Sequence, residues 1–193
     1  MKVIISLLMG LCLYPLATIA PAQTVAQPGS INGDISAFHG DQNTLVNAIQ
    51  AIEKSTGGKV LDIRFSNANG VPAYHAVILK AGQIHFFKLA EPSKNIIELD
   101  VSSTPVWMLN WRGKADVHYA KAATVSLSTA IRTAQQFRNG APAAAAGLAR
   151  SVGNPDSDVQ AYTVLLDDHG SVRSVSVDMS TGEVIADPSA LSY

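Results

Sequence analysis

The chain has 193 residues, 47% of them hydrophobic and 15% charged, so most of its length carries enough apolar material to fold around a core. The net charge of −1, from 14 basic and 15 acidic residues, argues against nucleic acid as a partner because phosphate binding needs a basic surface. The single cysteine excludes an intrachain disulfide and a cysteine-based zinc cage.

Residues 1–22 are predicted to be a secretory signal peptide. A positive start at Met1 and Lys2 precedes the apolar run Val3–Leu13, and Ala20-Pro21-Ala22 forms a cleavage motif. The apolar run is shorter than the roughly 20 residues that a membrane span requires. We therefore expect a periplasmic or secreted protein with no stable membrane span after signal cleavage.

The remaining chain divides by composition and by similarity between its two halves. Residues 23–40 are rich in Gly, Pro, Ser and Asn, which predicts a flexible leader. Two similar units follow, at 41–101 and 125–188, joined by a connector at 102–124 and followed by a tail at 189–193. Matching residues occur in the same order in both units, which predicts that the second unit is a copy of the first.

Each unit begins with a predicted amphipathic helix. Apolar residues in the first unit recur at the spacing of one helical face, and a similar set occurs 82 residues later. The first set is Leu45, Ala48, Ile49 and Ile52, and the second is Leu127, Ala130, Ile131 and Ala134.

Antiparallel strands are predicted after each helix, with an offset of 88 residues between units. The matching positions are Ala73-Tyr74 with Ala161-Tyr162, Gly82 with Gly170, and Ile96-Ile97 with Val184-Ile185. The predicted strands are about 59–66, 73–80, 83–90 and 95–101 in the first unit, and 159–166, 172–178 and 183–186 in the second. The fold class is therefore α+β, a tandem repeat of a two-layer unit with a helix packed on an antiparallel β-sheet.

Two segments are harder to assign from the sequence. The Ala-rich stretch 141–153 favours a short helix, although it could instead replace the first strand of the second unit. The connector contains both tryptophans, Trp107 and Trp111, and we expect Val106, Trp107 and Leu109 to pack between the units or to extend a sheet.

The second unit ends in Asp178-Met179-Ser180-Thr181-Gly182-Glu183-Val184, and this element, with the helix and strands before it, resembles the PepSY family. Asp178 can accept N–H groups across a turn, and Gly182 supplies backbone freedom there, so Asp178, Thr181 and Gly182 are expected to be structural turn residues. In the first unit, Lys94 replaces the turn glycine. The resemblance implies an exported protein that binds and restrains peptidases, with no catalytic residues to carry over.

No catalytic, cofactor-binding or metal-binding residues are predicted. The five histidines lack metal-ligand spacing, although His75 and His85 flank a predicted turn and could face each other. Ser171, Ser174 and Ser176 lie near His169 and Asp178, but without a nucleophile elbow we read them as hairpin residues. The chain is therefore expected not to be an enzyme and to need no cofactor.

The sequence leaves two functional hypotheses. The first is a non-catalytic protein-binding module whose partner is an envelope or secreted peptidase. The second is a self-associating structural or assembly module of the cell envelope, which would be a homo-oligomer. Candidate contact residues for the first are Trp107, Trp111, Phe86 and Phe87, because aromatic residues are enriched at interfaces. A self-associated dimer would bury Phe86 and Phe87.

Overall fold

A computed structural model of the chain describes residues 44–67, 72–90, 96–97, 103–149 and 160–186. The predicted signal peptide, leader and tail lie outside the described residues. The elements are α2 (Thr44–Thr56), β1 (Lys59–Ser66), β2 (Ala73–Lys80), β3 (Gln83–Ala90), β4 (Ile96–Ile97), β5 (Thr104–Pro105), the 3-10 helix η2 (Val106–Met108), α3 (Trp111–Ala122), α4 (Leu127–Phe137), β6 (Ala143–Ala149), β7 (Ala161–Asp168), β8 (Ser171–Asp178) and β9 (Val184–Ala186).

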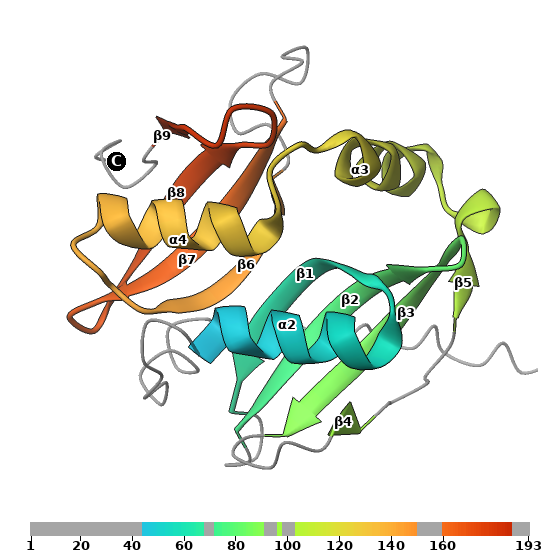
Figure 1. The fold of residues 1–193 in the computed structure, drawn as a ribbon, viewed down its shortest axis with the longest axis horizontal. Helices are drawn as coiled ribbons and strands as arrows, with labels where there is room; N and C mark the ends of the chain where they lie inside the picture. The colour runs from blue at the N-terminus through green and yellow to red at the C-terminus, as the bar shows by residue number, and fades with distance from the viewer. Residues whose placement is uncertain (1–43, 68–71, 91–95, 98–102, 150–159, 187–193) are drawn as a thin grey trace, which may run out of the picture.

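All the described strands belong to one antiparallel sheet, so the fold is α+β as predicted. The strand order is β4-β3-β2-β1-β6-β7-β8-β9, and β5 pairs with β3 beside this path. The centre of the sheet is the β1–β6 pair, in which Ile63 lies opposite Ala146 and Asp62 opposite Gly147. From this pair, the strands that follow α2 continue the sheet on one side as far as β4, and those that follow α4 continue it on the other side as far as β9 (Figure 1).

Helices α2 and α4 lie next to each other on one face of the sheet (Figure 1). Each buries one apolar stripe, as the helical spacing predicts. Ser126 caps the start of α4, because its side chain accepts a hydrogen bond from the backbone N–H of Thr129 at 3.1 Å. Because residues of both helices and of strands from both halves form one buried cluster, a single core lies beneath the two helices.

The turns that join β2 to β3 and β7 to β8 have the same backbone conformation. Ala81 and Gly82 have φ of 48° and 76°, and His169 and Gly170 have φ of 54° and 81°. Two consecutive positive φ values define the turn type whose twist matches that of a β-hairpin. Each bound of β7 lies 88 residues after the matching bound of β2, and β8 follows β3 by the same interval.

The helix favoured for 141–153 is wrong, because Ala143–Ala149 form strand β6. The strand is hydrogen-bonded to β1 on one side and to β7 on the other. Helix propensity is a weak preference that tertiary pairing overrides. Small side chains suit this central position, where α2 and α4 both contact β6 and Ala143, Ala144 and Ala146 are buried.

The connector contains a helix that the sequence analysis missed. Among the described side chains of α3, only Val117 and Ala120 are buried, so no apolar stripe marked it. These two residues form a second, smaller cluster with Leu61 and Ile84. Val77 of this cluster alternates along β2 with Ala76 and Ile78 of the main core, so α3 covers the sheet face opposite α2 and α4.

Candidate binding surface

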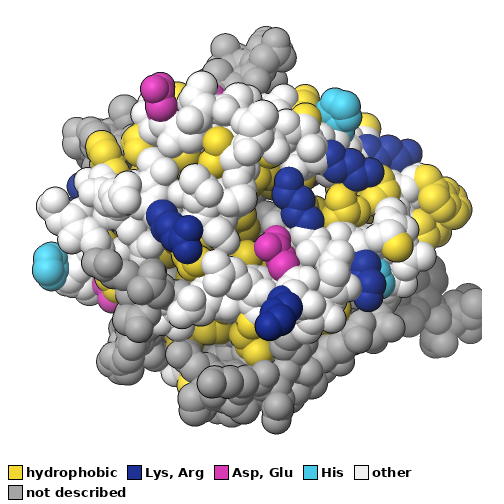
Figure 2. Space-filling model, in the orientation of Figure 1, with side chains coloured by type: hydrophobic (Ala, Val, Ile, Leu, Met, Phe, Trp, Pro, Cys, Tyr) yellow, Lys and Arg dark blue, Asp and Glu magenta, His cyan; other side chains and the backbone are white. Residues whose placement is uncertain are grey.

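Three large apolar side chains project into solvent where η2 meets α3. Trp107 is 73% exposed, Met108 60% and Trp111 73%, and we call these three residues the tryptophan surface. Figure 2 shows apolar side chains gathered at the right-hand edge of the molecule, where η2 lies in Figure 1. The expectation that Trp107 packs between the two units is therefore wrong. The alternative, that the connector extends a sheet, holds for Thr104–Pro105, which pair with β3. Exposed aromatic side chains in a group are typical of interaction sites.

The tryptophan surface is held by an ordered stretch of backbone. Before it, β5 pairs with β3, and the N–H of Val106 donates to the carbonyl of Gly82 at 3.0 Å. After it, the side chain of Asn110 caps α3 by accepting from the N–H of Gly113 at 2.9 Å. Val106 and Leu109 pack inward against the smaller cluster. Because Val106 and Leu109 point inward, Trp107 and Met108 between them point into solvent.

The two phenylalanines proposed as contact residues lie on opposite faces of β3. Phe86 is 45% exposed and lies opposite Val77 on the face that α3 partly covers. Phe87 is 5% exposed and belongs to the main core beneath the helices. Its position corrects the expected surface role, because a period-2 alternation along a strand sends neighbouring side chains to opposite faces.

A groove runs between α3 and the sheet face opposite α2 and α4. Its volume is about 300 Å³, and a neighbouring hollow of about 210 Å³ continues across β1, β6 and β7. Asp62 and Leu148 line both spaces. The other residues that line the groove under α3 are Leu61, Val77, Ile84, Leu109, Gly113, Asp116 and Val117. Apolar walls with two carboxylates give this groove a mixed character.

The carboxylate of Asp62 lies low against the sheet although the residue as a whole opens to solvent. A Cβ atom on Gly147 would overlap the Asp62 carboxylate, so the absence of a side chain at Gly147 makes room for it. Burial raises the pKa of Asp62, and the positive charge of Arg64 on the same strand partly opposes that shift.

The Asp178 turn follows β8 and is closed by backbone hydrogen bonds. One carboxylate oxygen of Asp178 accepts from the N–H of Ser180 at 2.7 Å and of Thr181 at 2.8 Å. These bonds lower the pKa of Asp178, since they favour its charged form. Thr181 accepts from the N–H of Glu183 at 3.3 Å, and Gly182 has φ of +79°. All three residues thus hold the backbone of the turn.

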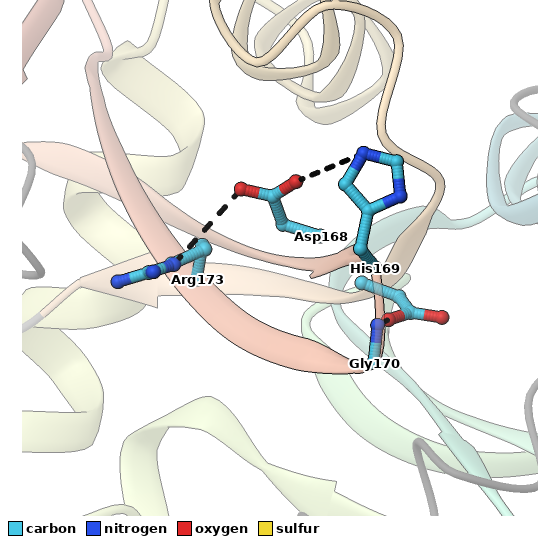
Figure 3. Close-up of polar contacts among 5 residues, drawn as sticks. Asp168, His169, Gly170 and Arg173 are labelled. Carbon is cyan, nitrogen blue, oxygen red and sulfur yellow. Dashed lines mark hydrogen bonds and ion pairs between the residues drawn. The ribbon is translucent and has the colours of Figure 1, made fainter.

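The tip of the β7–β8 hairpin carries a small set of charged side chains (Figure 3). Asp168 lies 3.9 Å from the fully exposed His169 and 3.9 Å from Arg173. Asp167 accepts a hydrogen bond from the N–H of Gly170 at 2.8 Å and so supports the turn. Exposed ion pairs at such distances contribute little to stability.

The histidine and serine combinations considered from the sequence do not assemble. His75 lies opposite Lys88 and His85 opposite Ile78, and the two histidines point to opposite faces of the sheet. His169 and Asp178 lie at opposite ends of β8. Among the described residues, no group of three or more His, Cys, Asp or Glu could hold a metal ion.

Comparisons with known proteins give one structural likeness. No family model matches the chain, and no curated protein matches it. The crystal structure of a protein named as a putative lipoprotein from Clostridium difficile 630 is 14% identical, with a TM-score of 0.43. The match covers 77% of this chain and 93% of that one. Within the described part of the chain, no helix is long and apolar enough to cross a membrane.

Proposed function

We propose that this chain is an exported, non-catalytic protein-binding module built from two PepSY-like units, and that its partner is an envelope or secreted peptidase. The predicted signal peptide supports export to the periplasm or the medium. The Asp178–Val184 element and its resemblance to PepSY sequences support the family and the peptidase partner. Fold alone transfers function poorly, so the binding role is argued from the surface.

The duplication is supported by matched geometry on the two sides of the sheet. Apart from β5, which belongs to the connector, α2 is followed by β1–β4 and α4 by β6–β9, and in both halves the first strand lies at the centre. The first seven residues of β2 and of β7 follow the same order of buried and half-buried positions. Copies of one ancestral unit would produce this arrangement, with α3 as an addition to the connector.

The tryptophan surface is the observation that carries the binding role. Exposing two Trp and one Met side chain to water is unfavourable, because each large apolar side chain gains roughly 1.5–3 kcal/mol when it is buried. Trp is also the residue type most enriched among energetically dominant interface contacts. A partner that covers Trp107, Met108 and Trp111 would recover this burial energy.

A capture experiment tests the proposal. Residues 23–193 are immobilised and exposed to envelope extract from the source organism, and bound proteins are identified by mass spectrometry. The double variant Trp107→Ser/Trp111→Ser is compared with Phe137→Ser, which removes an aromatic side chain that is 51% exposed on α4. We expect a peptidase that the wild type and Phe137→Ser capture and inhibit, and that the double variant releases. Equal capture by all three proteins contradicts the proposal.

Self-association is the second candidate, and the same exposed apolar surface favours it. An ordinary stable interface buries about 800 Å² on each partner. Three large side chains supply at most about 750 Å², taking roughly 250 Å² as the upper value for each. A homodimer would therefore need further surface. Mass in solution distinguishes the two candidates: a concentration-dependent dimer that the Trp107→Ser/Trp111→Ser variant abolishes supports self-association.

A further inference from the structure

The groove under α3 combines apolar walls with two carboxylates, which suits a ligand that has one apolar part and one positively charged end. Its sides are formed by aliphatic side chains, among them Leu61, Val77 and Leu148. Two carboxylates, Asp62 from β1 and Asp116 from α3, line the same space. The volume of about 300 Å³ lies at the lower limit for small-molecule pockets, which suits one long side chain.

Within the described part of the chain, neither carboxylate takes part in a hydrogen bond or an ion pair. The side chains of Asp62 and Asp116 are in this respect unlike those of Asp167 and Asp178, which accept backbone hydrogen bonds. The nearest positive influence on Asp62 is Arg64, which lines the neighbouring hollow and not the groove. Carboxylates that lie against apolar walls without a partner are stabilised by an incoming cation.

Gly147 contributes to this arrangement from the floor of the sheet. Any larger residue there would displace the Asp62 carboxylate from its position over β6. The pairing of Asp62 with Gly147 therefore holds the negative charge between the groove and the neighbouring hollow.

We propose that this groove binds an arginine or lysine side chain of a protein partner, with its aliphatic stem against Leu61, Val77 and Leu148 and its cationic end between Asp62 and Asp116. Long basic side chains combine an apolar stem with a charged end and suit such a site. That the cationic side chain belongs to a protein rests on the proposed function. Leu109 lines the groove and lies between Met108 and Trp111 in the chain, so one partner can contact both the groove and the tryptophan surface.

The inference is tested with short peptides, without the natural partner. Acetyl-Leu-Arg-Leu-amide is titrated into residues 23–193 labelled at the methyl groups of Ile, Leu and Val, and NMR shifts are followed. Its matched control contains citrulline, which has nearly the same shape as arginine but no charge. We expect the arginine peptide to shift the methyl signals of Leu61, Val77 and Leu148. It should bind about tenfold more tightly than the citrulline peptide, because the N–H groups of citrulline carry no charge and make weaker hydrogen bonds to a carboxylate.

Two substitutions test whether the arginine peptide binds at the carboxylate of Asp62. Asp62→Asn preserves size and is expected to weaken binding of the arginine peptide by about tenfold. Asp168→Asn, on the distant β7–β8 hairpin, is expected to leave it unchanged. Equal affinity for both peptides, shifts outside the groove, no binding of the arginine peptide, or wild-type affinity in Asp62→Asn would each overturn the inference.

The two proposals fail separately. If Trp107→Ser/Trp111→Ser abolishes capture of a peptidase but neither peptide binds in the groove, the protein-binding role stands and the groove assignment is wrong. If the arginine peptide binds as expected but no protein is captured, the groove chemistry stands and the proposed function is wrong.

Discussion

The carboxylate of Asp62 occupies the space above Gly147, its antiparallel neighbour across the central strand pair. One residue comes from the first strand after α2 and the other from the first strand after α4. The missing side chain of Gly147 and the position of the Asp62 charge are therefore two aspects of one contact. That contact lies where the two halves of the sheet meet.

A double-mutant cycle tests this contact. Gly147→Ala is expected to lower the free energy of unfolding by about 1–2 kcal/mol, because the added Cβ displaces the Asp62 carboxylate. In an Asp62→Ala background the same change is expected to cost little or to stabilise the strand, since the overlap is gone. Urea unfolding of the four proteins gives the coupling energy. Additive effects would show that the two residues do not interact.

The Asp178 turn gives a pH-dependent prediction. Its carboxylate has a lowered pKa in the folded chain, so it adds stability above the unfolded value of 3.8, and this contribution is lost as the pH falls through the folded pKa. We expect Asp178→Ala to lower the free energy of unfolding by about 1 kcal/mol at pH 7, the usual value of a capping side chain.

The check on Asp178 is a comparison at two pH values. Urea unfolding at neutral pH and again well below pH 3.8 should show the difference between Asp178→Ala and wild type shrinking in acid. Asp167→Ala, which removes a turn carboxylate with one backbone hydrogen bond, provides the reference. A difference that stays constant with pH would assign the Asp178 effect to something other than its charge.

Strain at the first hairpin can be relieved by one substitution. Ala81 has φ of 48°, a region that asparagine and glycine tolerate better than alanine. Ala81→Asn creates the Asn-Gly pair that this turn type prefers, and we expect it to raise the free energy of unfolding by about 0.5–1 kcal/mol. Gly82→Ala should have the opposite effect. A thermal unfolding midpoint for Ala81→Asn at or below that of wild type would contradict the prediction.

The shared core predicts one cooperative unfolding unit. Ile63 is fully buried and lies opposite Ala146 in the central pair. Ile63→Ala is expected to lower the free energy of unfolding by about 2–5 kcal/mol. Because both helices pack on one core, hydrogen exchange should accelerate in β8 as well as in β3. Acceleration confined to β3 would mean that the two halves unfold independently.

The sequence was most informative where a local pattern agrees with the tertiary environment. The apolar stripes of α2 and α4 were legible because each helix has one buried face. The glycines at 82 and 170 located the hairpin turns because positive φ favours that residue.

The elements that sequence reasoning misassigned depend on distant contacts. An alanine run does not reveal that strands lie on both sides of it, and α3 buries too few apolar residues to show a helical pattern. The groove combines Asp62, Asp116 and Leu148, which are far apart in the chain, so only the fold brings them together. The available signals were Asp62, two residues before Arg64, and Gly147 within an alanine run. Neither signal is specific to a binding site.

The central β1–β6 pair also has a kinetic consequence. Ile63 and Ala146 are 83 residues apart in the sequence, whereas both hairpins join neighbouring segments. The entropy lost when a loop closes grows with its length, by about 0.6 kcal/mol for each doubling. Contacts within each half therefore form early, and the refolding rate is governed by the encounter of β1 with β6. Until that encounter, each half presents an unpaired inner strand edge, and a second molecule can occupy it.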